Sequence, residues 1–148
     1  MARERFLRTL RALAECYHAF ERLSAPHVRA LGYTPAQFDI LVTLGNTPGM
    51  SFKELGELTL ITKGTLTGVV DRLEAMGVVR RRGSTTDGRS TIVVLTRRGE
   101  AEFRRVFGAH VAFLKQRFDV LTEEEMARFD TLAEKLRAGL AIAAGPVE

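Results

Sequence analysis

The sequence has one cysteine, no tryptophan and no long apolar run, and these shortages exclude several kinds of protein. A single cysteine, Cys16, cannot form a disulfide within the chain or build a multi-cysteine metal site. No apolar stretch approaches the roughly 20 residues that a membrane span needs. The amino terminus carries frequent arginines instead of the apolar core of a secretory signal, so we expect a cytoplasmic protein without membrane association.

Signatures of catalysis are also missing. The sequence contains no G-x-S-x-G motif, no phosphate-binding loop and no paired-carboxylate motif. The acidic run at residues 123–125 is better explained as a helix start, where the helix dipole favours negative charge. Clustered cysteine, histidine and carboxylate ligands for zinc are not evident either. We therefore expect no enzyme activity, no cofactor and no metal site.

The 148 residues are 45% hydrophobic and 27% charged, which is typical of one globular domain, residues 1–148. The net charge of +4 is unevenly distributed. Residues 78–98 hold six arginines and one aspartate, a charge of +5, whereas residues 119–148 hold seven acids and three basic residues, a charge of −4. The basic region favours a polyanionic partner, although a solvated charged face is the plain alternative.

Capping boxes mark three helix starts, at Thr34–Gln37, Ser51–Glu54 and Thr122–Glu125, and Thr62 is a further candidate cap. Apolar periodicity then predicts helices over about 3–24, 35–44, 52–58, 63–76, 97–119 and 123–143. Two β-branched runs, 78–82 and 91–95, flank a polar segment with an Asp-Gly turn. The predicted fold class is mainly α with a small β-hairpin wing.

Residues 51–73 fit a helix-turn-helix, in which the first helix directs Phe52, Leu55 and Leu58 inward. The second helix would bury its apolar residues and leave a small, polar face that can approach base edges. A structural helix pair is the alternative. The residues of this motif that we expect to contact DNA are Ser51, Lys63, Gly64, Thr65, Thr67, Gly68 and Arg72.

The basic hairpin directly after this helix suggests a winged arrangement. Arg80, Arg81 and Arg82 suit phosphate contacts, and Arg89 lies where a ribbon tip could enter a minor groove. Asp87 either orients Arg89 through a charge-assisted bond or simply forms the turn. Ser90 completes the predicted set of DNA-binding residues in the wing.

Three long amphipathic helices flank this compact middle, and one chain has too little core to bury all three apolar stripes. The expected organisation is a DNA-binding lobe at residues 34–98, with residues 1–31 and 99–148 forming a helical dimerisation region. The alternative is a monomer whose long helices fold back.

From about Thr34 to Gly99 the sequence resembles the MarR family of bacterial and archaeal regulators. The matching stretches are TPAQFDILVTL, SFKELGELTLITKGTLTGVVDRLEAMGVVRR and DGRSTIVVLTRRG. The resemblance implies an obligate homodimer that binds a pseudo-palindromic operator in double-stranded DNA. It places the Lys63–Arg72 helix in the major groove and the Arg89 wing in the minor groove. It also implies a ligand or oxidant sensed where the dimer helices join the DNA-binding lobe.

Residues that could line such an effector site, for a small aromatic or phenolic molecule, are Tyr17, Phe20, His27, Arg29 and Phe113. An aromatic stripe at helical spacing is, however, usually core. Cys16 is expected to be a buried structural cysteine, although one branch of the family senses hydroperoxides with a cysteine in the first helix.

The predicted function is a sequence-specific transcriptional regulator, a ligand-responsive repressor that acts as a homodimer. The alternative is a winged-helix module that binds proteins and not DNA. Salt-dependent binding to duplex DNA would separate the two.

Overall fold

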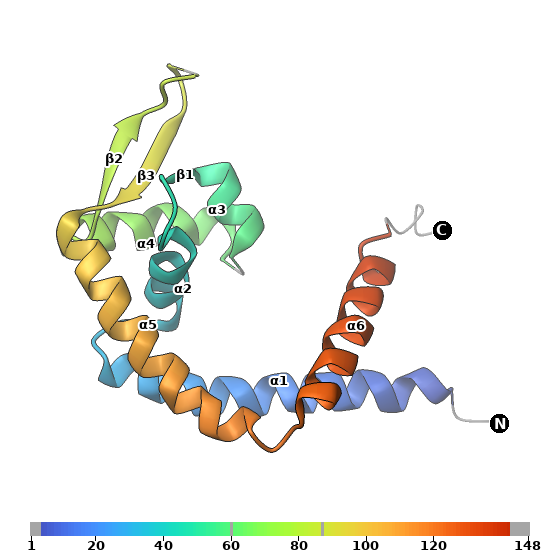
Figure 1. Ribbon diagram of the computed structural model, residues 1–148. Coiled ribbons are helices and arrows are strands. Elements are labelled where there is room, and N and C mark those ends of the chain that lie inside the picture. Colours follow the sequence, from blue (N-terminus) through green and yellow to red (C-terminus); the bar gives the residue numbers. More distant parts are fainter. Residues whose placement is uncertain (1–3, 60, 87, 143–148) are drawn as a thin grey trace. The chain divides into compact units, whose positions relative to one another are not determined.

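A computed structural model describes residues 4–59, 61–86 and 88–142 of the chain (Figure 1). The chain forms two compact units, Met1–Val111 and Ala112–Glu148. The elements are α1 (Arg5–Ala30), α2 (Pro35–Leu44), β1 (Met50–Ser51), α3 (Phe52–Leu58), α4 (Lys63–Ala75), β2 (Val79–Gly83), β3 (Thr91–Leu95), α5 (Arg97–Phe118) and α6 (Glu123–Leu140). The predicted fold class, mainly helical with a β-hairpin wing, is confirmed.

The three predicted capping boxes are present. Thr34, Ser51 and Thr122 each accept a hydrogen bond from the backbone N–H three residues later, and the Gln or Glu there accepts one in return. Thr62 differs, because it precedes α4 without a side-chain cap. Its hydroxyl donates instead to the Thr65 hydroxyl, at 3.1 Å.

The core of the first unit lies where α2, α3 and α4 pack against the sheet and against parts of α1 and α5. It consists mainly of aliphatic side chains, among them Ile40, Leu41, Leu44, Leu55, Leu66, Val70, Leu73, Val79 and Val93. Leu58 was expected to point inward but is 62% exposed. It lies at the last residue of α3, and the next residue, Thr59, is buried with its hydroxyl donating to the Leu55 carbonyl.

The first helix continues past its predicted end near residue 24, through Pro26, to Ala30. A proline inside a helix removes one hydrogen bond. Val28, two residues later, is fully buried in the core, and the burial of an aliphatic side chain is worth about 1.5–3 kcal/mol. Tertiary packing therefore accounts for the helical turns that local sequence signals did not predict.

The sheet has three strands, in the order β1-β3-β2, and both pairings are antiparallel. The predicted hairpin is confirmed, with Arg80 opposite Val94 and Arg82 opposite Ile92. The short strand β1, in which Met50 pairs with Val93, was not predicted. Because Ser51 ends β1 and also caps α3, the helix-turn-helix is tied directly to the wing.

The first turn of α5 packs closely against the base of the wing. A Cβ added to Gly99 would lie 1.8 Å from the carbonyl oxygen of Val78, so only glycine fits there. The Thr96 hydroxyl donates to the Gly77 carbonyl at 2.6 Å and accepts from the Gly99 N–H at 3.0 Å. Gly77 itself has a φ of +77°, as its predicted place after α4 requires.

Much of the predicted apolar face of the long helices is exposed. On α1 this holds for Phe6, Leu10, Leu13, Tyr17 and Phe20, on α5 for Phe107, Val111 and Phe118, and on α6 for Phe129, Leu132, Leu136 and Leu140. None of the described helices combines the length and apolar character needed to cross a lipid bilayer.

Candidate nucleic-acid interface

The second helix of the helix-turn-helix, α4, has two distinct faces. Leu66, Val69, Val70 and Leu73 are buried, as predicted. The opposite face consists mainly of small or polar residues. All of them are exposed except Gly68, which is half-buried. The residues of this face are Lys63, Gly64, Thr65, Thr67, Gly68 and Arg72. The N-terminal turn of α4 therefore presents a surface with little side-chain bulk.

At two positions of this face, nothing in the described residues requires glycine rather than a larger residue. A Cβ added to Gly64 or Gly68 would meet no atom within 4 Å, and neither residue has a positive φ. Glycine inside a helix costs about 1 kcal/mol relative to alanine. Both residues instead keep the helix surface low, as close approach to another molecule requires.

Ser51, another predicted DNA-binding residue, serves as the cap of α3. Its hydroxyl accepts from the Glu54 N–H at 3.1 Å, while its own N–H donates to the Glu54 carboxylate at 2.7 Å. The capping bond occupies the oxygen as an acceptor, so the hydroxyl proton is still available to donate.

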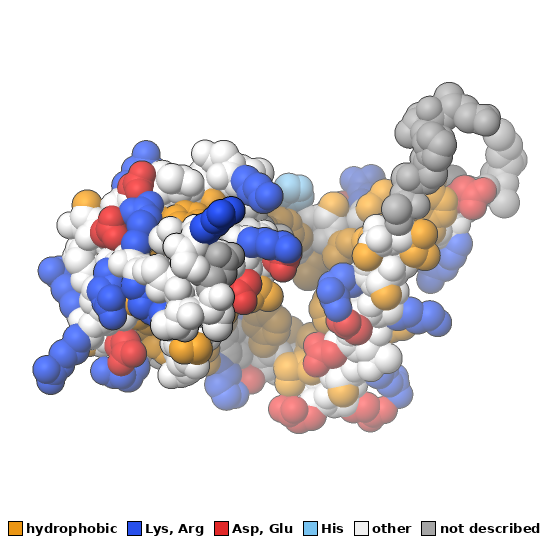
Figure 2. All heavy atoms as spheres, turned by 90° about the horizontal axis from the view of Figure 1, so that it is seen from above, with side chains coloured by type: hydrophobic (Ala, Val, Ile, Leu, Met, Phe, Trp, Pro, Cys, Tyr) orange, Lys and Arg blue, Asp and Glu red, His pale blue; other side chains and the backbone are white. Residues whose placement is uncertain are grey.

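The arginines of the wing lie on both faces of the hairpin, because successive strand residues alternate in direction. Arg80 is exposed, and Arg82 is half-buried and donates to the Pro48 carbonyl at 3.1 Å. Arg89 is exposed and Ser90 half-buried near the tip. Asp87 lies outside the described residues. Seen from above, the winged unit carries many Lys and Arg side chains with fewer acidic ones among them (Figure 2).

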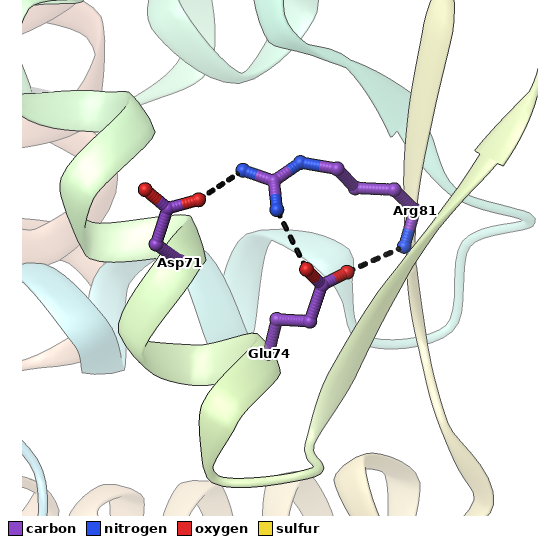
Figure 3. Close-up of polar contacts among 3 residues, drawn as sticks. All are labelled: Asp71, Glu74 and Arg81. Atoms are coloured by element: carbon purple, nitrogen blue, oxygen red, sulfur yellow. Dashed lines mark hydrogen bonds and ion pairs between the residues drawn. The ribbon is translucent and has the colours of Figure 1, made fainter.

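Arg81 forms ion pairs within the chain. Its guanidinium pairs with two carboxylates of α4, at 2.5 Å from Asp71 and 2.7 Å from Glu74 (Figure 3). The hydrogen bond to Asp71 is the main reason why the pKa of Arg81 is raised further above its ordinary value. The sequence held a signal for this contact, since Asp71 and Glu74 are one helical turn apart just before a basic strand.

The candidate effector residues lie on the two long helices α1 and α5. Tyr17, Phe20 and Arg29 are exposed on α1. Phe113 is on α5, where the Cζ atom of Arg117 lies 5.8 Å from its ring centre. Cys16 is exposed too, so the expectation of a buried structural cysteine is wrong for this chain. Cys16 is exposed because it lies in a part of α1 that does not pack against the core: residues 4–22 are all exposed.

His27 lies in a polar cluster with Ser24 and His110. Its Nδ1 is 2.9 Å from Nδ1 of His110, the two rings stack, and Ser24 contacts the other nitrogen of His110 at 2.9 Å. Burial, and secondly the neighbouring His27, lower the pKa of His110. Sequence reasoning did not select His110, because only the packing of α1 against α5 brings it to His27. Within the described residues, no three potential ligands converge on a metal site.

A helix pair whose second helix has an exposed polar face, and whose first helix is joined to a basic hairpin by a short strand, defines a winged helix-turn-helix DNA-binding protein. Residues 31–90 match the sequence profile of the MarR family. The chain is 30% identical to the HTH-type transcriptional repressor MdtR of Bacillus subtilis (strain 168), over 71% of this chain and 68% of MdtR. The protein therefore belongs to the MarR family of transcriptional regulators.

Two further similarities extend over more of the chain. It is 28% identical to the HTH-type transcriptional regulator MhqR of Bacillus subtilis (strain 168), over 83% of this chain and 85% of MhqR. The crystal structure of Sco3205, a MarR family transcriptional regulator from Streptomyces coelicolor in complex with DNA, superposes with a TM-score of 0.81 at 27% identity. The match covers 91% of this chain and 87% of Sco3205. The chain thus has the fold of a DNA-binding transcriptional regulator along most of its length.

Proposed function

We propose that this protein is a ligand-responsive repressor that binds a pseudo-palindromic operator as a homodimer. The observation that carries the proposal is the exposed face of α4, where two glycines leave the helix surface low beside Lys63 and Thr65. The N-terminal turns of a recognition helix contact base edges in the major groove, and a low surface permits that approach. The wing, with Arg89 near its tip, would reach the adjacent minor groove.

Homodimer formation is supported by the exposed apolar residues of α1, α5 and α6. Such faces are unfavourable in water, and a second copy of the chain offers matching faces. A two-fold symmetric dimer would present two copies of α4 to two half-sites on one duplex, which is why we propose a pseudo-palindromic operator.

An effector response is supported by the polar cluster around His27. The cluster joins α1 to α5 through Ser24, His27 and His110. The ring of Phe38, on α2, packs edge-on against the His110 ring, with 5.0 Å between the ring centres. A small aromatic or phenolic molecule bound near His27 and the exposed Arg29 could change how α1 and α5 meet the DNA-binding helices.

The test of direct readout compares the wild-type protein with the Lys63→Ala and Thr65→Ala variants over a randomised operator library. We expect a changed base preference at one or two symmetric positions, since a specifying contact is worth about 1–3 kcal/mol. Lys135→Ala, on the exposed surface of α6, is the control and should keep the wild-type preference.

Two results would contradict this proposal. If both α4 variants retain the wild-type preference and affinity, α4 is not the reading helix. If the wild-type protein shows no salt-dependent binding to duplex DNA, the alternative of a winged-helix module for protein interaction is favoured.

A further inference from the structure

The contact between the wing and α4 is concentrated on one side chain, that of Arg81. From β2 its guanidinium bridges Asp71 and Glu74 of α4, with one nitrogen on each carboxylate. Its carbon Cζ also lies 5.5 Å from the ring centre of Phe52, at the start of α3. One arginine thus joins three elements, and its side chain is only 28% exposed.

Glu74 adds a second attachment, to the backbone of the same strand. Its Oε2 accepts from the Arg81 backbone N–H at 3.1 Å, while its Oε1 accepts from the guanidinium. Because β2 is an edge strand of the sheet, this outward N–H has no partner strand. The carboxylate therefore holds both the backbone and the side chain of one wing residue against the helix.

This arrangement does not suit a phosphate ligand. If the Arg81 guanidinium turned to a phosphate, Asp71 and Glu74 would remain as two uncompensated negative charges beside a polyanion. Arg80 and Arg82, whose side chains leave the opposite face of β2, have no ion pair to a carboxylate within the described residues.

We propose that Arg81 is a positioning residue for DNA binding, which acts by bridging Asp71 and Glu74 and so sets where the wing stands relative to α4. The inference rests on the proposed function, in which α4 and the wing contact one duplex. A wing already held in place binds without the entropic cost of ordering it at the DNA surface.

The decisive test asks whether removal of the two carboxylates strengthens or weakens DNA binding. The full-length protein carrying Asp71→Asn and Glu74→Gln loses two negative charges near the DNA. Simple electrostatics predicts tighter binding for this variant, whereas loss of the bridge predicts weaker binding. We expect binding to weaken by about tenfold. A change of this size lies within the range of interaction energies measured between residues that share a salt-bridge network.

The probe is a fluorescein-labelled duplex whose sequence the wild-type protein enriches from a randomised library, and fluorescence anisotropy gives the affinity. Arg81→Gln alone should weaken binding to a similar extent. Combined with the two acid substitutions it should weaken binding no further, because all three side chains act through one contact. Arg81→Lys should fall between wild type and Arg81→Gln, since an ammonium lacks the planar fork that spans two carboxylates.

Salt dependence separates positioning from phosphate contact. Arg81→Gln should leave the slope of log affinity against log salt unchanged, whereas the matched variant Arg80→Gln should reduce its magnitude by about 1 if Arg80 contacts phosphate. Hydrogen exchange of the free protein supplies a readout without DNA, and the amides of β2 should exchange faster in the Asp71→Asn, Glu74→Gln variant. Neither acid is buried, since their side chains are 58% and 41% exposed, so the fold should survive, as circular dichroism would verify.

The inference is overturned if the acid variant binds equally or more tightly, if its effect adds to that of Arg81→Gln, or if Arg81→Gln lowers the salt slope. These outcomes leave DNA binding by the wild-type protein intact. Failure of the wild-type protein to bind any duplex would instead overturn the proposed function, and this inference with it.

Discussion

A small polar network attaches the loop between α1 and α2 to α5. The Tyr33 hydroxyl donates to the Glu102 carboxylate at 2.6 Å, and Arg105 pairs with the same carboxylate at 2.8 Å. Arg105 also donates to the Leu31 carbonyl at 3.0 Å. The Glu102 carboxylate therefore accepts from two side chains at the junction of this loop with α5.

This network predicts a pH dependence of stability. The hydrogen bonds from Arg105 and then from Tyr33 lower the pKa of Glu102 from 4.5 to about 2. Because the folded-state pKa lies below the unfolded one, the stabilisation is complete above about pH 4.5 and is lost as the pH falls towards 2. Glu102→Gln should therefore lose less stability over this range than the wild-type protein does.

The measurement is the denaturant midpoint at a series of pH values and one protein concentration, which must be constant if the protein associates. Tyr33→Phe is the matched variant, since it removes one hydrogen bond and leaves the Arg105 pair. An intermediate pH dependence is expected for it. An identical acid dependence in the wild-type and Glu102→Gln proteins would show that this network does not control acid stability.

Arg89 carries the second prediction at this scale. It is exposed near the tip of the wing, which we propose to reach the minor groove. Arg89→Ala should weaken DNA binding and lower the magnitude of the salt slope by about 1 if it contacts one phosphate. If it reads a narrow minor groove, the loss should be greatest with A·T-rich flanks. Unchanged affinity on both kinds of flank would remove Arg89 from the interface.

At the scale of elements, the glycines of α4 lower the stability of the helix but serve its proposed contact with DNA. Gly68→Ala should raise the free energy of unfolding by up to about 1 kcal/mol, because the added methyl group meets no atom of the chain within 4 Å. The same methyl group should weaken DNA binding, since it raises the surface that approaches the groove. Thermal unfolding and anisotropy measure the two effects.

Gly139→Ala on α6 is the control for this prediction, because an added Cβ there also meets nothing within 4 Å. It should stabilise the protein and leave DNA binding unchanged. Tighter or equal DNA binding by Gly68→Ala would show that α4 does not lie close to the duplex at this position.

Element boundaries show where local sequence signals suffice. Capping boxes predicted the starts of α2, α3 and α6, because the hydrogen bonds that define them join residues three apart. The end of α1 and the whole of β1 were not predicted. Val28 extends α1 by packing in a core made from other helices, and Met50–Ser51 forms a strand only because β3 lies beside it.

The whole molecule exposes more apolar surface on its long helices than a lone chain can readily keep in water. Phe6 of α1 and Leu132 of α6 are 59% and 66% exposed. We expect a homodimer at micromolar concentration. Leu132→Lys combined with Leu136→Lys should shift it towards monomer and weaken DNA binding, since two half-sites would no longer be bound together.

Sedimentation velocity over a range of protein concentrations measures this equilibrium. Lys135→Ala, an exposed polar residue of the same helix, should leave the dimer intact. A compact, folded species of 16.4 kDa for the wild-type protein across the micromolar range would contradict the prediction.

The sequence alone determined the helices, the hairpin and the family, because helix caps, apolar periodicity and the DGRS motif are local patterns. It also determined which face of α4 is polar, since the 3.6-residue period follows from the order of residues. Only the tertiary structure decided which charged groups are paired. Arg80, Arg81 and Arg82 are equivalent by composition, yet Arg81 alone faces Asp71 and Glu74. Pairing depends on the distance between atoms remote in sequence, and the packing of β2 against α4 sets that distance.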